Sequence, residues 1–216
     1  MGKLQVELRM TINNYWVVVG LKNKKLEKVY VPDRVDGYEV RSIAGGAFAN
    51  NKNITYINLP ESINYIGEGA FSGCSNLEKV YRNYSHYGKL EIHNRAFFNC
   101  AKLSNIHLNG ITELGKEVFD GCTALTEFPF DACENLKVLK QRTFANTGIT
   151  SVTLHSQQVC KNAFYNTPVE EVFIRGKATW STDFYDVLKK AQVYVPKKSP
   201  FLDLSFHGIC VKESLK

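Results

Sequence analysis

The stretch "IGEGAFSGCSNLEKV" (Ile66–Val80) contains the unit that decides the fold. Four of its residues, Ala70, Phe71, Cys74 and Leu77, have the spacing of one face of a short helix. After Leu77 the apolar spacing shortens toward the period of two that is typical of a β-strand. The stretch therefore predicts a helical turn that is followed by a short strand.

This unit recurs along the chain around a central phenylalanine, at intervals of 20 to 26 residues. The six clear copies and a weaker seventh are centred on Phe48, Phe71, Phe97, Phe119, Phe144 and Phe164, and on Phe184. Five residues before each of the first six phenylalanines the residue is aliphatic, and the residue immediately before is small or β-branched. After the phenylalanine comes an apolar-x-x-apolar-x-apolar pattern, as in Leu103, Ile106 and Leu108.

A single unit of this kind cannot bury its own apolar face. About eight stacked turns are therefore predicted to share one continuous core, with parallel strands along one side. The copy after Phe71 departs from the pattern, because it places Arg82 where the other copies have an apolar residue.

In these features the chain resembles leucine-rich repeats of the BspA-like type, from about residue 20 to about residue 200. The shared motif is IxxxAFxxCxxLxxVxLP, seen in "IAGGAFANNKNITYINLP" (Ile43–Pro60) and in the stretch at Ile66–Val80. The segments Val29–Phe48 and Val193–Phe201 look like the family's usual first and last turns. The fold that this implies is an α/β solenoid: a right-handed leucine-rich-repeat coil of about eight turns, with short parallel strands and capped at both ends.

Many leucine-rich repeats carry Asn or Cys three residues after the last strand leucine, where the side chain caps the backbone. Here those positions hold Ser62, Ile111, Cys133 and Gln157. We therefore expect no such ladder, and expect the phenylalanine column to fill the turn instead.

A solenoid exposes apolar surface at each end, which has to be covered. We expect residues 1–25 to form an N-terminal cap, residues 26–196 the BspA-like repeats and residues 197–216 a C-terminal cap. Two units carry insertions, Tyr81–Leu90 and Phe128–Leu139.

Composition narrows the classes of protein that remain. The chain has 216 residues, of which 44% are hydrophobic, and it has no run of 18 apolar residues, so no membrane span is expected. The net charge is +6, and lysines gather in Leu21–Lys28 and near residues 189–198. Such basic ends can bind nucleic acid, or can simply keep an elongated molecule in solution. The N-terminus has no apolar core of signal-peptide length. Either the protein stays in the cytosol, or a signal peptide was removed.

Signals of catalysis are few. The six cysteines form no CxxC pair and the histidines form no HExxH motif, so we expect no metal and no cofactor. The cysteines in the repeated slot are predicted to be small buried fillers. Gly67 and Gly69 would suit a phosphate-binding loop, but the other copies exchange them freely. We therefore expect a scaffold and not an enzyme, with a hydrolase as the alternative that would need polar groups gathered in a pocket.

Strand residues that point away from the core are the candidate binding residues. One outward column contains Lys28, Tyr56, Lys79, Asn105, Glu127, Ser151, Glu171 and Gln192. The other contains Tyr30, Asn58, Tyr81, His107, Pro129, Thr153, Phe173 and Tyr194. Exposed aromatic rings are common anchors in recognition, although aromatic residues also suit strands for their own sake. The predicted binding residues are Tyr30, Tyr56, Tyr81, Tyr84, Tyr87, His107, Phe173 and Tyr194.

The resemblance to the BspA-like family implies a surface-displayed or secreted module that binds host or matrix proteins. We therefore expect a non-catalytic protein-binding or adhesion module that recognises its partner through the strand side. We further expect a monomer at the cell surface or outside the cell, with glycans as a further class of partner. The alternative is an intracellular scaffold, located in the cytoplasm, or a weak nucleic-acid-binding repeat protein that uses its basic ends.

Overall fold

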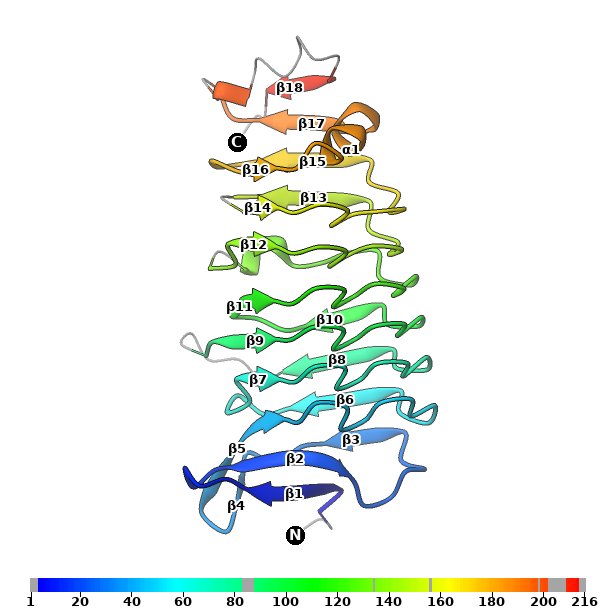
Figure 1. Cartoon of the computed structure of the whole chain (residues 1–216), viewed down its shortest axis with the longest axis vertical. Coiled ribbons are helices and arrows are strands. Elements are labelled where there is room, and N and C mark those ends of the chain that lie inside the picture. Colours follow the sequence, from blue (N-terminus) through cyan, green and yellow to red (C-terminus); the bar gives the residue numbers. More distant parts are fainter. Residues whose placement is uncertain are drawn as a thin grey trace.

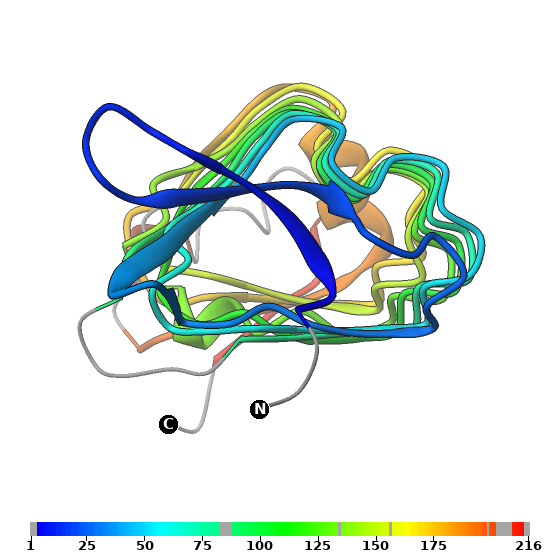
Figure 2. The same cartoon turned by 90° about the horizontal axis from the view of Figure 1, so that it is seen from below.

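The computed structural model describes residues 4–82, 88–133, 135–155, 157–197, 199–201 and 209–213. The chain is a β-solenoid of about eight turns, stacked into an elongated molecule (Figure 1). Viewed along the stack, successive coils lie over one another with a three-sided outline (Figure 2). Two of the sides consist of strands, here called the first and second face, and the third is the turn side, which contains the repeated phenylalanines.

The first face consists of two sheets whose strands are all parallel. One sheet contains β3 (Lys28–Tyr30), β6 (Tyr56–Leu59), β8 (Lys79–Arg82) and β10 (Asn105–His107). The other contains β13 (Ser151–Leu154), β15 (Glu171–Ile174), β17 (Gln192–Val195) and β18 (Val211–Glu213). Apart from β18, these strands coincide with the apolar-x-x-apolar-x-apolar pattern, so the prediction of short parallel strands is confirmed.

The second face also consists of two sheets, and the sequence did not predict them. The longer sheet contains the parallel strands β2 (Trp16–Leu21), β5 (Tyr38–Ile43), β7 (Tyr65–Ile66), β9 (Leu90–Ile92) and β11 (Ile111–Leu114). Antiparallel to its members are β1 (Val6–Met10), which pairs with β2, and β4 (Arg34–Val35), which pairs with β5. The shorter sheet contains β12 (Val138–Leu139), β14 (Gln158–Val159) and β16 (Thr179–Trp180). Through the repeats, the aliphatic residue five before each phenylalanine lies in these strands.

The prediction of a helical turn is wrong for the six clear copies, although α1 (Phe184–Lys190) begins at the phenylalanine of the weaker seventh. In the described residues, 3-10 conformation occurs in η1 (Phe130–Ala132) and at residues 200–201. The residues two before and two after each phenylalanine have left-handed backbone conformations, with φ between +52° and +80°. These residues are Gly46, Asn50, Gly69, Gly73, Arg95, Asn99, Glu117, Gly121, Arg142, Asn146, Asn162 and Asn166. A right-handed helix cannot contain them.

Hydrogen bonds explain why turns are preferred on this side. The N–H groups of the first five phenylalanines, Phe48 to Phe144, donate to the neighbouring coil, as from Phe48 to the carbonyl of Ala70 (2.8 Å) and from Phe71 to that of Ala96 (2.7 Å). The residues between these donors bond locally, as from Ala49 to the carbonyl of Gly46 (3.0 Å). Because alternate N–H groups bond between coils, the turn side is a third hydrogen-bonded ladder. These N–H groups are therefore not available to the carbonyls of a helix.

The glycines of the opening stretch are accounted for by this ladder and not by a ligand. A Cβ atom on Gly67 would lie 2.5 Å from the backbone nitrogen of Gly45 in the preceding coil. Gly69 and Gly73 have φ values of +60° and +72°. Gly67 therefore leaves room for the preceding coil, while Gly69 and Gly73 occupy left-handed positions that glycine adopts without strain.

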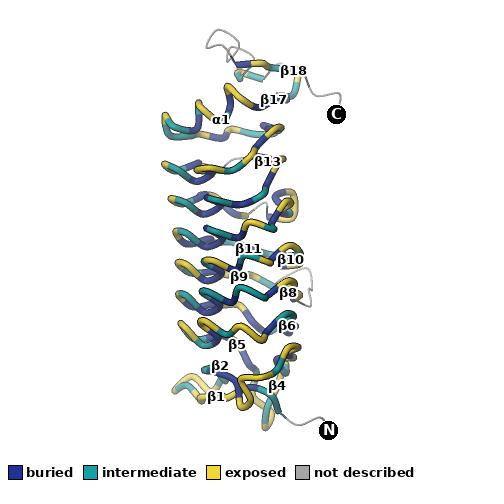
Figure 3. Tube along the Cα trace, turned by 90° about the vertical axis from the view of Figure 1, so that its right-hand side faces the viewer, coloured by how far each residue is buried: buried dark blue, intermediate teal, exposed yellow. Residues whose placement is uncertain are grey.

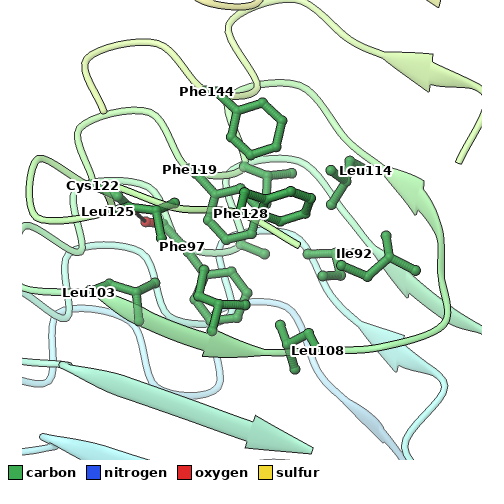
Figure 4. Packing of buried hydrophobic residues seen from close by; sticks show 14 of the residues in the cluster. Ile92, Phe97, Leu103, Leu108, Leu114, Phe119, Cys122, Leu125, Phe128 and Phe144 are labelled. Atoms are coloured by element: carbon green, nitrogen blue, oxygen red, sulfur yellow. Dashed lines mark hydrogen bonds between the residues drawn. The ribbon is translucent and has the colours of Figure 1, made fainter. Parts of the chain in front are cut away.

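The core is a single cluster inside the coils, where buried segments line the interior and exposed ones form the rim (Figure 3). The rings of Phe48, Phe71, Phe97, Phe119, Phe144 and Phe164 stack in order, with neighbouring centroids 4.9 to 5.5 Å apart and planes within 16° of parallel. Figure 4 shows part of this column with the aliphatic residues around it. The predicted phenylalanine column therefore does fill the turn.

Both faces are interrupted at one level of the stack, which we call the junction. The strands end at β10 and β11 below it and resume at β12 and β13 above it, with no strand pairing between them in the described residues. On the first face, Phe128 packs edge-on against Phe144 (Figure 4). Phe130 also packs edge-on against Phe144. Glu127 and Pro129 alternate with these buried rings as expected, but they belong to no strand in the described residues, because η1 begins directly after Pro129.

The two ends differ from the repeats. At the N-terminal end the hairpin of β1 and β2 extends the second face, while at the C-terminal end β18 extends the first. The division into residues 1–25, 26–196 and 197–216 stays a prediction, and residues 202–208 lie outside the described part of the chain.

Candidate functional site

The strand register brings most of the predicted binding residues together on the first face. Below the junction, Tyr30, Asn58, Tyr81 and His107 occupy matching positions on β3, β6, β8 and β10. Above it, Thr153, Phe173, Tyr194 and Lys212 do so on β13, β15, β17 and β18. Tyr56 lies in the neighbouring column, beside Lys28 and Lys79. Tyr84 and Tyr87 lie outside the described residues.

These rings form three contacts. The centroids of Tyr30 and Tyr56 lie 5.7 Å apart, and those of Tyr81 and His107 lie 5.8 Å apart, both with tilted planes. Phe173 and Tyr194 stack almost in parallel at 4.6 Å. Tyr30 and Tyr81 are 53% and 42% exposed, which is high for such large apolar side chains on a strand. The first face therefore presents aromatic surface in two groups, one on each side of the junction.

The stacked pair of Phe173 and Tyr194 has a defined protonation state. The Tyr194 hydroxyl donates to the Glu171 carboxylate (3.2 Å), and desolvation together with this carboxylate raises the pKa of Tyr194. The phenol is therefore a neutral donor at physiological pH. Because each ring covers one face of the other, the pair offers its ring edges and one hydroxyl to a partner.

A polar cluster next to the junction was not predicted. Asp131 in η1 accepts from His155 Nε2 (2.9 Å) and lies 3.7 Å from Arg175 Nη1. His155 follows β13 and Arg175 follows β15, so the cluster joins the ends of these strands to the inserted helix. Since Asp131 lies in an insertion of irregular backbone, no periodic signal in the sequence places it there.

Arg82 is the departure from the repeat that the sequence revealed, and the structure explains it. The side chain is 2% exposed and donates to the carbonyls of Ile63 (2.9 Å), Asn109 (2.9 Å) and Glu61 (3.0 Å). A Cβ atom on Gly88 would lie 2.7 Å from Arg82 Nη2, so a glycine leaves room for the guanidinium. Arg82 thus ties three coils together at the base of the insertion next to Tyr81.

The repeated cysteines are more than apolar fillers. The thiols of Cys74, Cys100 and Cys122 each donate to the phenylalanine carbonyl of the preceding coil, at 3.0 to 3.1 Å. Thr167 does the same with its hydroxyl, to the carbonyl of Phe144 (2.7 Å). A backbone-capping ladder therefore exists, three residues after the phenylalanine instead of three after the strand. Ser62 adds a rung at the position where none was expected, because its hydroxyl donates to Val40 (2.8 Å).

Burial also sets the protonation state of these thiols. Desolvation raises the pKa of Cys74 to about 11 and that of Cys133 to about 12, and it also raises the pKa values of Cys100 and Cys122. A thiol that stays protonated is a hydrogen-bond donor and a poor nucleophile.

Within the part of the chain that the structure describes, no three His, Cys, Asp or Glu side chains come together as a metal site. In the same residues, no helix is long and apolar enough to cross a membrane.

The sequence of residues 41–170 matches the BspA type leucine-rich repeat region in six copies. The chain belongs to the BspA-type leucine-rich repeat family. Because members are repeat proteins whose faces serve for interactions, the family implies a protein-interaction module of the surface type.

Solved structures share the fold of this BspA-type chain. A leucine-rich cell surface protein from Faecalibacterium prausnitzii aligns with a TM-score of 0.70 and 19% identity, covering 90% of this chain and 54% of its own. The leucine-rich repeat protein TpLRR from T. pallidum aligns with a TM-score of 0.58 and 21% identity, covering 81% of this chain and 71% of its own. This chain thus spans about half the length of the F. prausnitzii protein. Among curated proteins, none is significantly similar to it in sequence.

Proposed function

We propose that this chain is a non-catalytic module that binds another protein through its first face. The observation that carries the proposal is the set of exposed aromatic rings that the strand register aligns on that face, from Tyr30 to Tyr194. Rigid, partly exposed aromatic side chains contribute much of the free energy in protein interfaces. The ladders on all three sides hold these rings in place before binding, which lowers the entropy lost on association.

The setting that we propose is the cell surface or the extracellular space, with a host or matrix protein as partner. Support comes from the family and from the F. prausnitzii neighbour, which is described as a cell surface protein. We further propose that the module acts as a monomer and that glycans on the partner contribute to the contact. The raised pKa values of the buried thiols support a role without catalysis.

The test is a screen of the whole chain for binding to extracellular proteins. For each partner found, its affinity is then measured for the variants Tyr81→Ala, Phe173→Ala and Tyr194→Ala of this chain. Each substitution is expected to weaken binding by roughly tenfold or more, the size typical of an interface hot spot. Matched controls are Tyr38→Ala on the second face and Tyr165→Ala on the turn side, both exposed tyrosines, which should leave affinity unchanged.

Unchanged affinity in all three aromatic variants would show that the partner binds elsewhere. Binding to random DNA is the comparison for the alternative function. Retention on DNA that falls steeply with salt, without any protein partner, would favour a nucleic-acid-binding protein instead.

A further inference from the structure

A small pocket lies where two strands of the first face end. It has a volume of about 220 Å³ and is lined by the loops after β15 and β17. Its walls include Ile174, Pro196 and Phe201, and the ring of Phe201 packs against Trp180 at 5.2 Å. Pockets that enclose a whole small molecule have volumes of roughly 300–1,000 Å³. This one suits a side chain or two of a larger partner.

Three cations line the pocket: Arg175, Lys177 and Lys197. No acidic side chain is among the described residues that line it. Within those residues neither lysine forms an ion pair, and the N–H groups of Gly176 and Lys177 donate to no acceptor. Arg175 reaches Asp131 only at 3.7 Å, with both side chains more than half exposed. In the described residues, the two lysines and the free N–H donors therefore meet here without an anion, while Arg175 is shared with Asp131.

The pocket is continuous with the aromatic group above the junction. Phe173 lies two residues before Arg175 on one strand, and Tyr194 lies two residues before Pro196 on the next. Because an extended chain advances about 3.3 Å per residue, the pocket begins about 7 Å from the stacked rings. A segment that lies along these strands and contacts the rings would reach the pocket within two or three of its own residues.

We propose that this pocket binds an acidic side chain, Asp or Glu, on an extended segment of the protein partner. The inference rests on the proposed function and names the chemistry of the partner. The carboxylate would lie between the guanidinium of Arg175 and the ammonium groups of Lys177 and Lys197, and the neighbouring apolar residues of the segment would lie against Phe173 and Tyr194. Charge-assisted hydrogen bonds from a guanidinium to a carboxylate are among the stronger polar contacts in interfaces.

The test uses a fluorescein-labelled octapeptide of alternating Glu and Val with capped termini, and a second peptide with Gln in place of Glu. Fluorescence anisotropy with the full chain at low salt is expected to show the Glu peptide binding about fivefold more tightly. The preference should shrink as salt is raised, because exposed charges are screened beyond about 10 Å at 0.1 M. Equal affinity for the two peptides would overturn the inference.

Matched variants distinguish binding at a specific site from attraction by the overall net charge of the chain. In the triple variant Arg175→Gln, Lys177→Gln and Lys197→Gln the preference is expected to disappear. In the control Lys25→Gln, Lys102→Gln and Lys116→Gln, which removes as many charges from exposed positions below the junction and outside the two outward columns, it should remain. An equal loss in both variants would mean that the peptide senses only overall charge. Tighter binding of a sulfated oligosaccharide or of DNA, dependent on the same three residues, would also overturn an acidic peptide as the ligand.

The partner itself distinguishes this inference from the proposed function. If binding of the partner needs Tyr81, Phe173 and Tyr194 but not the three cations, the proposed function stands and the proposed role of the pocket is wrong. If binding does not depend on the aromatic residues, the proposed function is wrong. In that case the peptide measurement alone tests the pocket.

Discussion

At the scale of single residues, one small side chain does two tasks in this molecule. Cys74, Cys100 and Cys122 fill the space beside the phenylalanine column and also cap a carbonyl of the preceding coil. The sequence predicted the first task, because small apolar residues recur at one spacing. It could not predict the second, because the acceptor is a backbone atom 25 to 29 residues away.

The buried thiols should make stability depend on pH in the alkaline range. Their pKa values are raised in the folded chain, so unfolded thiols ionise first, near their ordinary value of 9. Below pH 9 the contribution of the thiols to stability is fully present. Above pH 9 the free energy of unfolding should fall, by at most about 1.4 kcal/mol per pH unit for each thiol. Urea unfolding of the wild type and of Cys74→Ser between pH 8 and 11 measures the slope, which should be smaller in the variant.

Labelling of native protein with a thiol reagent at pH 8 provides the companion measurement. Cys210 is exposed and Cys160 is partly exposed, so both should react before the other four. Fast labelling of Cys100 would contradict the burial described above.

Arg82 shows that a charged residue can occupy a core position when its N–H groups donate to buried carbonyls. In Arg82→Leu the apolar residue of the other repeats returns, but three carbonyls lose their donor. We expect the free energy of unfolding to fall by about 2–4 kcal/mol, since hydrogen bonds to charged groups contribute about 1.5–3 kcal/mol each and the gain in apolar burial offsets part. Chemical denaturation measures this, with exposed Lys79→Leu as the control. A variant as stable as the wild type would show that the carbonyls find other donors.

At the scale of elements, the sequence indicated which residues are buried but not how the backbone presents them. Ala70, Phe71, Cys74 and Leu77 are all fully buried, as their spacing predicts. The helix expected for them is absent, because Gly69 and Gly73 adopt left-handed conformations. In other copies Arg95 and Glu117 do the same, although their side chains do not signal it. The visible signal was the residue two after each phenylalanine, which is Asn or Gly in all six copies. These residue types tolerate positive φ best.

This column of Asn and Gly provides a test of the turn geometry. A Cβ atom on Gly121 would lie 2.2 Å from Asn99 Oδ1, at a φ of +80°. Gly121→Ala should therefore lower the free energy of unfolding by about 1–3 kcal/mol, from backbone strain and steric overlap together. In the double variant with Asn99→Gly the overlap disappears, so about 1 kcal/mol should return. A thermal unfolding cycle of the four proteins would show strict additivity if the two residues did not meet.

The candidate site was predictable to the extent that it depends on strand register. Tyr30, Tyr81 and His107 align as expected, and so do Phe173 and Tyr194. Pro129 is partly exposed between buried Phe128 and Phe130 as the pattern predicts, but η1 begins directly after it, so in the described residues it belongs to no paired strand. The polar cluster at Asp131 and the pocket at Arg175 could not be predicted, since loops without periodicity place them.

At the scale of the whole molecule, the solenoid is two stacks of coils that meet at the junction. Across it run the turn-side hydrogen bonds, such as Phe119 to Thr143 (2.9 Å), and an aromatic cluster in which Phe128 contacts Phe119, Phe130 and Phe144. In a linear stack each coil contacts only its neighbours, so cooperativity depends on the weakest interface between them. These aromatic contacts therefore couple the two halves.

Phe128→Ala should weaken that coupling. The substitution is expected to cost about 3–4 kcal/mol, the usual range for a buried phenylalanine, and to separate the unfolding of the two halves. Hydrogen exchange followed by mass spectrometry should then show different opening free energies for residues 28–114 and 138–195. The control is Phe71→Ala, an equally buried change within one half, which should lower stability without separating the halves. A single transition in both variants would mean that the turn-side ladder suffices.

The junction also determines how the molecule would respond to mechanical load. In a stack pulled from its two ends, every coil carries the same tension in series, and the interface with the fewest bonds yields first. Most coils here are joined by backbone hydrogen bonds on three sides, whereas the junction is joined by the turn side, by packed rings and by side-chain contacts such as Lys140 to Glu113. A module that tethers two bodies in flow would therefore part near its middle, leaving each half still bound to what it holds.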